Sequence, residues 1–118
     1  MKQSLVRIDN RLVHGQILES WVPFLRASRI IVVNDDVTGD LFRESIIRMA
    51  VPKEIELIVQ GVDEFAQQHS AAGADSSDTR HTIILFSGIE DVLRAHRLGV
   101  RFDSLNVGNV QNSSHKKI

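Results

Sequence analysis

Cysteine is absent from this sequence of 118 residues. That absence excludes a disulfide framework and a thiolate metal site, and nothing in the chain requires an oxidising compartment, so we expect a cytoplasmic protein. Long apolar runs are also absent, since none approaches the roughly 20 residues that cross a bilayer. The N-terminus turns polar after two apolar residues and so lacks a signal-peptide core. We therefore expect a soluble chain.

An excess of charge of either sign is missing as well. The chain has 14 Lys and Arg against 15 Asp and Glu, so no overall field favours a polyanion such as DNA, and any recognition of phosphate has to be local. With 42% apolar and 25% charged residues, the chain can bury a core without disulfides or metals. We expect one domain over residues 1–118, without repeats.

Five short apolar segments have the composition of strands: residues 5–8, 29–34, 54–60, 82–87 and 103–108. The second contains four consecutive β-branched residues, which suit a strand covered on both faces, as in a parallel sheet. Each gap between segments is long enough for a crossover helix. The pattern predicts an α/β fold, an open and mainly parallel twisted sheet with helices on both faces, in three α/β/α layers.

The first two gaps show the spacing of amphipathic helices. Residues 17–25 place Trp21 on an apolar face, and Pro23 is expected to distort or end that helix near Val22. The second helix, which Pro52 ends, has the same spacing in Leu41, Phe42, Ile46, Met49 and Ala50. We expect both apolar faces to belong to the core.

The other two gaps also contain helical spacing. The third helix, over residues 62–69, is short and is expected at the periphery. The fourth begins with a capping-box spacing at residues 87–90, directs Ile89, Val92 and Leu93 inward, and ends at Gly99 in a left-handed conformation. Residues 70–81, small and polar, are expected to form a surface loop.

Polar residues follow the predicted strands at their carboxyl ends, where an open parallel sheet binds its ligand. They are Asp9, Asn10, Arg11 and His14 after the first strand, Asn34, Asp35 and Asp36 after the second, Ser87 and Gly88 after the fourth, and Asn106, Gly108 and Asn109 after the fifth. The topology predicts that these groups gather along one edge of the sheet.

His14 has the surroundings of a phosphate-accepting residue. It precedes Gly15 at the start of a helix, where free backbone N–H groups and the helix dipole hold an anion and a glycine permits close approach. A neutral imidazole, with an ordinary pKa of about 6.5, is a good nucleophile toward phosphorus. Arg11 can grip phosphate oxygens, and Asp9 can orient either Arg11 or the imidazole. These residues predict a phosphohistidine loop.

Structural interpretations of these residues compete with the chemical one. A histidine before a glycine at a loop–helix junction is more often a structural hydrogen-bonding residue than a nucleophile, and Arg7 is expected to be structural or part of an ion pair. Asp35 and Asp36 fit a helix N-terminus better than a cation site. The other histidines share no metal-binding spacing: His69, His81, His96 and His115. We expect no metal and no cofactor.

Three segments, RIDNRLVHGQILESWVP, RIIVVNDDV and LNVGN, carry a resemblance to a known family. They resemble the IIB component of the mannose/fructose/sorbose family of the bacterial phosphoenolpyruvate-dependent sugar phosphotransferase system. The most specific pattern is that family's active-site loop, Asp-x-Arg-Leu-x-His-Gly-Gln, filled here by Asp9, Arg11, Leu12, His14, Gly15 and Gln16. The similarity extends from Arg7 to Val110.

The resemblance implies a phosphocarrier enzyme, a protein-N(pi)-phosphohistidine–sugar phosphotransferase. In that family the loop histidine takes a phosphoryl group from a IIA phosphohistidine and passes it to a sugar bound by the membrane IIC and IID subunits. His14 and Arg11 are then the catalytic residues. The supporting residues are Asp9, Gly15 and Gln16. The residues expected to border the site are Asp35, Ser87 and Asn106. The chain would act in the cytoplasm at the periphery of the transporter.

The C-terminus departs from the family pattern. Members usually continue past NVGN through a further helix-containing segment and a closing strand, whereas this sequence ends at Ile118, so it is expected to be either a naturally short protein or a fragment. A shorter C-terminus would leave an edge strand exposed, which self-association would relieve. We expect this departure to affect stability, oligomeric state and docking rather than the chemistry.

Two other functions compete with the phosphocarrier. The short C-terminus also fits a regulatory module of the same fold that does not support sugar transfer. The pair Asp35 and Asp36 suggests a second alternative, a receiver-like phosphoacceptor. The third strand, however, ends at Gln60 and Gly61 without an aspartate to accept phosphate. For the phosphocarrier, the nitrogen of His14 that accepts phosphate depends on what the other nitrogen hydrogen-bonds.

Overall fold

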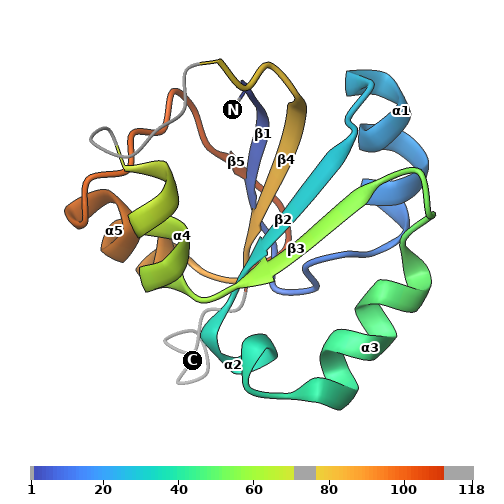
Figure 1. Ribbon diagram of the computed structural model, residues 1–118, viewed down its shortest axis with the longest axis horizontal. Helices are drawn as coiled ribbons and strands as arrows, with labels where there is room; N and C mark the ends of the chain where they lie inside the picture. Colours follow the sequence, from blue (N-terminus) through green and yellow to red (C-terminus); the bar gives the residue numbers. More distant parts are fainter. Residues whose placement is uncertain (1, 71–76, 111–118) are drawn as a thin grey trace, which may run out of the picture.

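A sheet of five parallel strands forms the centre of the structure (Figure 1). The computed structural model describes residues 2–70 and 77–110. The strands lie in the order β3-β2-β4-β1-β5, and their bounds are Lys2–Ile8 for β1, Arg29–Val33 for β2, Glu56–Gln60 for β3, His81–Phe86 for β4 and Asn106–Val107 for β5. The predicted α/β class is confirmed, although β1 begins earlier and β5 is shorter than expected.

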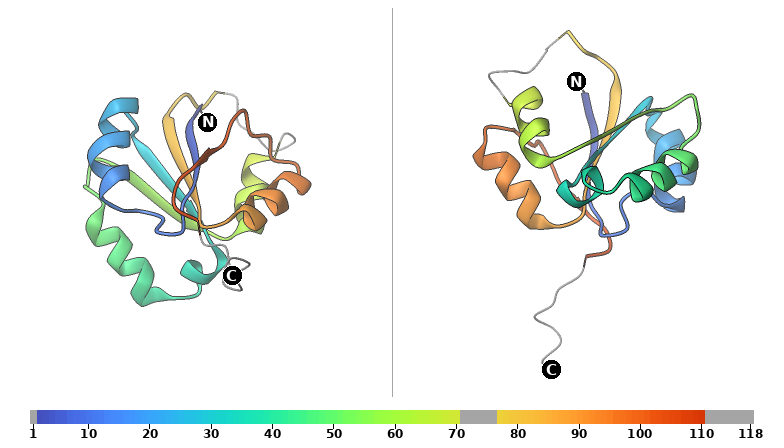
Figure 2. Two further views of the ribbon diagram at one scale, coloured as in Figure 1. Left: turned by 180° about the vertical axis from the view of Figure 1, so that it is seen from behind. Right: turned by 60° about the horizontal axis from the view of Figure 1, so that its bottom comes forward.

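Helices cover both faces of this sheet (Figure 2). One face carries η1 (Ile17–Trp21), α1 (Val22–Leu25), α2 (Asp35–Thr38) and α3 (Leu41–Ala50), and the other carries α4 (Val62–His69) and α5 (Ile89–Arg97). The connections from β1 to β2 and on to β3 move in one direction along the sheet, and those from β3 to β4 and on to β5 move in the other. Because such crossovers are right-handed, the reversal puts the last two helices on the second face. The three predicted layers are present.

The β2 strand shows how the apolar runs of the sequence become a core on both faces. All five of its residues are buried. Successive side chains point to opposite faces, so Ile30 and Val32 pack with the η1 side while Ile31 and Val33 pack with the α4 and α5 side. A strand covered on both faces has no position for a polar alternation, which explains the unbroken apolar sequence of residues 30–33.

Pro23 distorts the first helix but does not end it. In η1 the N–H of Val22 donates to the carbonyl of Ile17, a π turn, and α1 then continues through Pro23. The helix stops where Arg26 adopts a left-handed conformation with φ of 52°, and the N–H of Ala27 donates back to Val22. Of the two effects expected of Pro23, distortion of the helix or its end near Val22, the structure shows the distortion.

The apolar face of α3 points outward, contrary to the prediction of a core face. Phe42 is 77% exposed and Met49 is 85% exposed, and Leu41 and Ile46 are exposed as well. This helix lies beside β3, an edge strand, where Nη1 of Arg48 donates to the carbonyl of Leu57 (Figure 1). Beyond the edge strand there is no sheet for that face to cover. The α3 helix contacts the core through Ile47, whose side chain packs against the buried residues on this face of the sheet.

The two helices of the other face also correct the sequence-based expectations. The α4 helix is not peripheral, because Val62, Phe65 and Ala66 are buried in the core. In α5 the inward residues are Val92 and Ala95, while Ile89 and Leu93 are exposed. A small alanine at this position lets α5 lie close to its neighbours, which a count of large apolar residues does not reveal.

The ends of the helices differ from prediction as well. The N-cap of α5 is Gly88, without a side-chain capping bond, and Ser87 instead accepts a hydrogen bond from Nδ2 of Asn34 at 2.9 Å. The left-handed stop at Gly99 is confirmed, with φ of 108°. Asn34 caps the short helix α2, and Asp35 and Asp36 lie in its first turn, which confirms the helix N-terminus expected for this pair. Part of the expected loop 70–81, residues 71–76, lies outside the described residues.

Within residues 2–70 and 77–110, no helix combines the length and apolar character needed to span a bilayer.

Candidate active site

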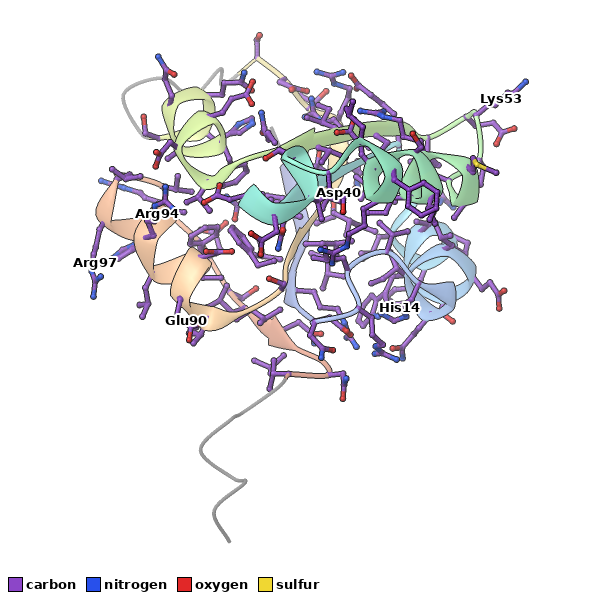
Figure 3. All side chains as sticks on the ribbon, turned by 90° about the horizontal axis from the view of Figure 1, so that it is seen from below. His14, Asp40, Lys53, Glu90, Arg94 and Arg97 are labelled. Carbon is purple, nitrogen blue, oxygen red and sulfur yellow. The ribbon has the colours of Figure 1, made fainter. Side chains whose placement is uncertain are left out.

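The loop after β1 brings His14 to the carboxyl edge of the sheet, which Figure 3 views from below. The N–H of Asp9 still donates to Phe86 on the neighbouring β4, at 2.8 Å. The chain then turns through Leu12, whose side chain is buried and whose backbone is left-handed with φ of 56°. A helical stretch follows, in which the N–H of Leu18 donates to the carbonyl of His14 at 3.1 Å. His14 therefore stands at a helix start, as predicted.

Asp9 is fully buried and contacts three basic side chains. Its Oδ2 accepts from Nη2 of Arg11 at 2.7 Å and from Nη2 and Nε of Arg7 at 3.3 and 3.4 Å. Nε2 of His14 lies 3.2 Å from the same oxygen. Oδ1 accepts from Nε and from the backbone N–H of Arg11, at 2.9 and 3.0 Å. One carboxylate thus joins the arginine and the histidine that the sequence predicts for this site.

These contacts keep Asp9 ionised. Hydrogen bonds from the Arg11 side chain hold the pKa of the Asp9 carboxyl well below its usual range, and backbone N–H groups and the neighbouring His14 add to that effect. Burial acts in the opposite direction and is outweighed. The same ion pair raises the pKa of Arg11. The site is therefore built around a carboxylate anion that can accept hydrogen bonds and cannot donate them.

The geometry at His14 selects one tautomer of its ring. Because ionised Asp9 can only accept, the contact at 3.2 Å requires the proton on Nε2. The lone pair of a neutral imidazole is then on Nδ1. Among the described residues, Nδ1 of His14 has no hydrogen-bond partner, and the side chain is 15% exposed. The nitrogen left for a nucleophilic role is Nδ1.

Groups that can hold an anion lie in the same loop and helix start as His14. The side chain of Arg11 is 46% exposed, so its guanidinium can reach a group arriving from solvent. The first intrahelical bond runs from Leu18 to His14, which leaves the N–H groups of Gly15 and Gln16 without a partner inside the helix. A phosphate at His14 would therefore meet both a cation and a helix N-terminus.

Comparison with known protein families identifies the family of this chain. The family model described as "PTS system sorbose subfamily IIB component" matches residues 3–118. The chain belongs to this family. Membership of this family supports a phosphotransfer role in a sugar phosphotransferase system (PTS). The resemblance drawn from the loop around His14 is confirmed.

Relatives of this IIB chain align over nearly all of it. The sorbose-specific EIIB component of Klebsiella pneumoniae is 35% identical over 118 residues, 99% of this chain and 70% of the relative. The fructose-specific EIIB component of Bacillus subtilis (strain 168) is 30% identical over 113 residues, 96% of this chain and 68% of the relative. The solved IIBSor domain of the sorbose permease from Klebsiella pneumoniae has a TM-score of 0.80 at 33% identity, covering 95% of this chain and 67% of that one. The fold is that of the family's IIB components.

One predicted supporting residue, Gln16, and one residue expected at the border of the site, Asn106, lie beside the Asp9 cluster. Oε1 of Gln16 accepts from Nη2 of Arg7 at 3.1 Å, and Oδ1 of Asn106 on β5 accepts from Nη1 of the same arginine at 2.5 Å. Both therefore act on Asp9 through Arg7. The expectation that Arg7 forms an ion pair is confirmed, and its guanidinium also lies 6.0 Å from the centre of the Trp21 ring.

The other two residues expected at the border of the site are engaged elsewhere. Ser87 binds Asn34, and Asp35 accepts from the backbone N–H of Val62 and from Arg94, at 2.9 and 2.8 Å. In Figure 3, Arg94 and Glu90 lie across the carboxyl edge from His14. Among the described residues, no side-chain hydrogen bond joins Asp35 or Ser87 to Asp9, Arg11 or His14. The described residues also contain no group of three or more His, Asp or Glu that could hold a metal.

The sequence analysis missed the part that Gly108 plays in the site. A Cβ on this residue would overlap Nη2 of Arg7 and would lie 2.5 Å from Oδ2 of Asp9. The backbone after β5 thus closes directly over the buried ion pair, with the N–H of Gly108 donating to Ile8. Only glycine leaves room for that approach. The glycine of the NVGN segment is visible in the sequence, but its partners Arg7 and Asp9 lie about a hundred positions earlier in the chain, so the sequence alone does not connect them.

Proposed function

We propose that this IIB chain is a phosphocarrier in which Nδ1 of His14 accepts a phosphoryl group from the phosphohistidine of a IIA protein or domain. The group then passes to a sugar presented by membrane IIC and IID subunits. The observation that carries the proposal is the contact between Nε2 of His14 and the buried Asp9 carboxylate, 3.2 Å long, because it leaves Nδ1 as the nucleophile.

In the first step Nδ1 of His14 attacks phosphorus, and the bond from phosphorus to the donor imidazole breaks. The ring keeps its proton on Nε2 and gains positive charge, which the Asp9 carboxylate offsets. Arg11 and the N–H groups of Gly15 and Gln16 hold the phosphoryl oxygens as charge redistributes on them. No metal is needed for this balance of charge.

In the second step a hydroxyl oxygen of the sugar attacks the same phosphorus. The bond from phosphorus to Nδ1 breaks, the hydroxyl loses its proton to solvent water, and His14 returns to the neutral tautomer that Asp9 stabilises. Because the phosphorus–nitrogen bond is retained between the two steps, the carrier keeps the transfer potential of its donor. The chain would do this on the cytoplasmic side of the transporter, as a peripheral subunit without a nucleic-acid partner.

The experiment is phosphorylation with phosphoenolpyruvate, the two general PTS proteins and the cognate IIA protein. We expect an acid-labile, alkali-stable phosphate on the wild-type chain and none on His14→Ala. His96→Ala is the matched control, because His96 is an exposed histidine on α5, and it should be phosphorylated like the wild type. Label that persists in His14→Ala, or an unlabelled wild type, would refute the proposal.

A further inference from the structure

We propose that Arg7, which is too deeply buried to touch the phosphoryl group, is a positioning residue that keeps Asp9 paired while Arg11 turns from Asp9 to the phosphoryl group on His14. The inference rests on the proposed function and adds to it a residue for which the sequence analysis expected a structural role. It assigns different tasks to the two arginines that share one carboxylate.

The two arginines differ in their freedom to move. Arg11 is 46% exposed, and its side chain is held by Asp9. Arg7 is almost completely buried and is held on several sides, by Asp9, by Asn106 on β5, by Gln16 and by the ring of Trp21. Arg7 therefore stays in place whenever the fold is intact, whereas Arg11 can rotate into solvent.

The burial of Asp9 makes this difference important for phosphoryl transfer. If Arg11 left a carboxylate that had no other cation, a fully buried charge would remain without compensation, which is strongly unfavourable. The backbone at Gly108 lies close to both Oδ2 of Asp9 and Nη2 of Arg7, so it leaves little room for water on the Arg7 side of the carboxylate. Arg7, with Nη2 at 3.3 Å from the same oxygen, supplies positive charge before the His14 ring gains its own through phosphorylation. It thereby lowers the cost of moving Arg11 onto the phosphoryl group.

The test uses phosphoramidate, a small phosphoryl donor, so that no partner protein enters the measurement. Nδ1 of His14 attacks phosphorus, the phosphorus–nitrogen bond of phosphoramidate breaks, and ammonia leaves with a proton from water. Rates are measured for the full chain in a double-mutant cycle of Arg7→Met and Arg11→Met. We expect Arg7→Met to lower the maximal rate about 100-fold and to change KM by less than about 3-fold, whereas in the Arg11→Met background it lowers the rate less than about 3-fold further.

Arg29→Met is the matched control for removing a buried arginine. Arg29 begins β2 at the opposite end of the sheet, is also almost fully buried, and pairs with Asp78 at 2.8 Å. We expect this variant to lose thermal stability and to react at the wild-type rate. Arg7→Lys keeps the positive charge, and we expect it to react at least about 10-fold faster than Arg7→Met. If Arg7→Met does not fold, Arg7→Lys takes its place in the test and should react within about 10-fold of the wild-type rate.

The outcomes separate this inference from the proposed function. Equal slowing by Arg7→Met in the wild-type and Arg11→Met backgrounds would show that Arg7 does not act through Arg11 and would overturn the inference. Slowing by Arg29→Met to the same extent would overturn it too, because the effect would then be general destabilisation. A wild-type chain that takes no phosphate on His14 would overturn the proposed function, and with it the role of Arg7.

Discussion

Replacing Asp9 by asparagine tests how much of the fold depends on the ion-pair cluster. The two carboxylate oxygens of Asp9 both accept from arginine, Oδ1 from Arg11 and Oδ2 from Arg7 and Arg11, and Oδ2 also accepts from Nε2 of His14. In the variant one of these positions becomes an NH₂ group that faces other donors, and the buried guanidinium of Arg7 loses its counter-charge. Asp9→Asn therefore removes a buried ion pair without changing the volume of the side chain.

Breaking a buried ion pair by removing one partner costs about 3–5 kcal/mol. Arg11 is partly exposed, so solvent screens its share of the interaction, and we take the lower end of that range, about 3 kcal/mol, for the free energy of unfolding at pH 7. Urea unfolding followed by circular dichroism measures this difference. Asp103→Asn is the control, because Asp103 is exposed, and it should change the free energy of unfolding by less than about 0.5 kcal/mol.

The pH dependence of the same difference supplies a second check. The pKa of Asp9 is depressed in the folded chain by Arg11, so its stabilisation is complete above the ordinary carboxyl pKa and is lost as the pH falls toward the folded value. The gap in free energy between wild type and Asp9→Asn should stay constant from about pH 8 to pH 5 and narrow below about pH 4. A gap below about 1 kcal/mol at pH 7, or one that widens in acid, would refute the account of Asp9.

Other substitutions test separate parts of the structure. Gly108→Ala should cost about 1–3 kcal/mol in urea unfolding, because its Cβ meets Asp9 and Arg7, and an effect no larger than that of Gly39→Ala would contradict the overlap. Phe65→Ala should lower the free energy of unfolding by about 3–5 kcal/mol, because the ring is fully buried 5.8 Å from that of Phe86. Met49→Lys should shift it by less than about 0.5 kcal/mol, and a loss above about 2 kcal/mol would show that the outer face of α3 is buried.

The sheet and the position of His14 could be predicted from the sequence because both depend on local signals. Residues 30–33 of β2 are apolar and buried, and four of the five strands are followed by polar residues whose place at the carboxyl edge comes from the parallel topology. The order strand, loop, His14, Gly15 and helix is contained in ten consecutive residues. No distant contact was needed to locate this part of the site.

The outward face of α3 could not be predicted in the same way. Helical spacing shows that Leu41, Phe42 and Met49 share one face, but it does not show whether a sheet lies under that face. The answer depends on β3 being an edge strand, which is a property of the strand order. The same limit explains α5, where the small residue Ala95 faces the core and the larger Leu93 does not.

The surroundings of Arg7 depend on contacts between distant parts of the chain. Its partner Asn106 is 99 residues away, and the close approach of Gly108 follows from β5 pairing with β1. An arginine within an apolar strand indicates an ion pair, and Asp9 two residues later is the nearest candidate in the sequence. That a buried arginine and an exposed one would share the Asp9 carboxylate with His14 became visible only in three dimensions.

The most direct test of the central claim is to locate the phosphate on the ring of His14. The chain, labelled with nitrogen-15 at histidine, is phosphorylated through its IIA donor, and nitrogen–phosphorus coupling is measured by NMR at alkaline pH. The hydrogen bond from Nε2 to Asp9 predicts phosphate on Nδ1 of His14. Phosphate on Nε2, or on any other residue, would contradict the account.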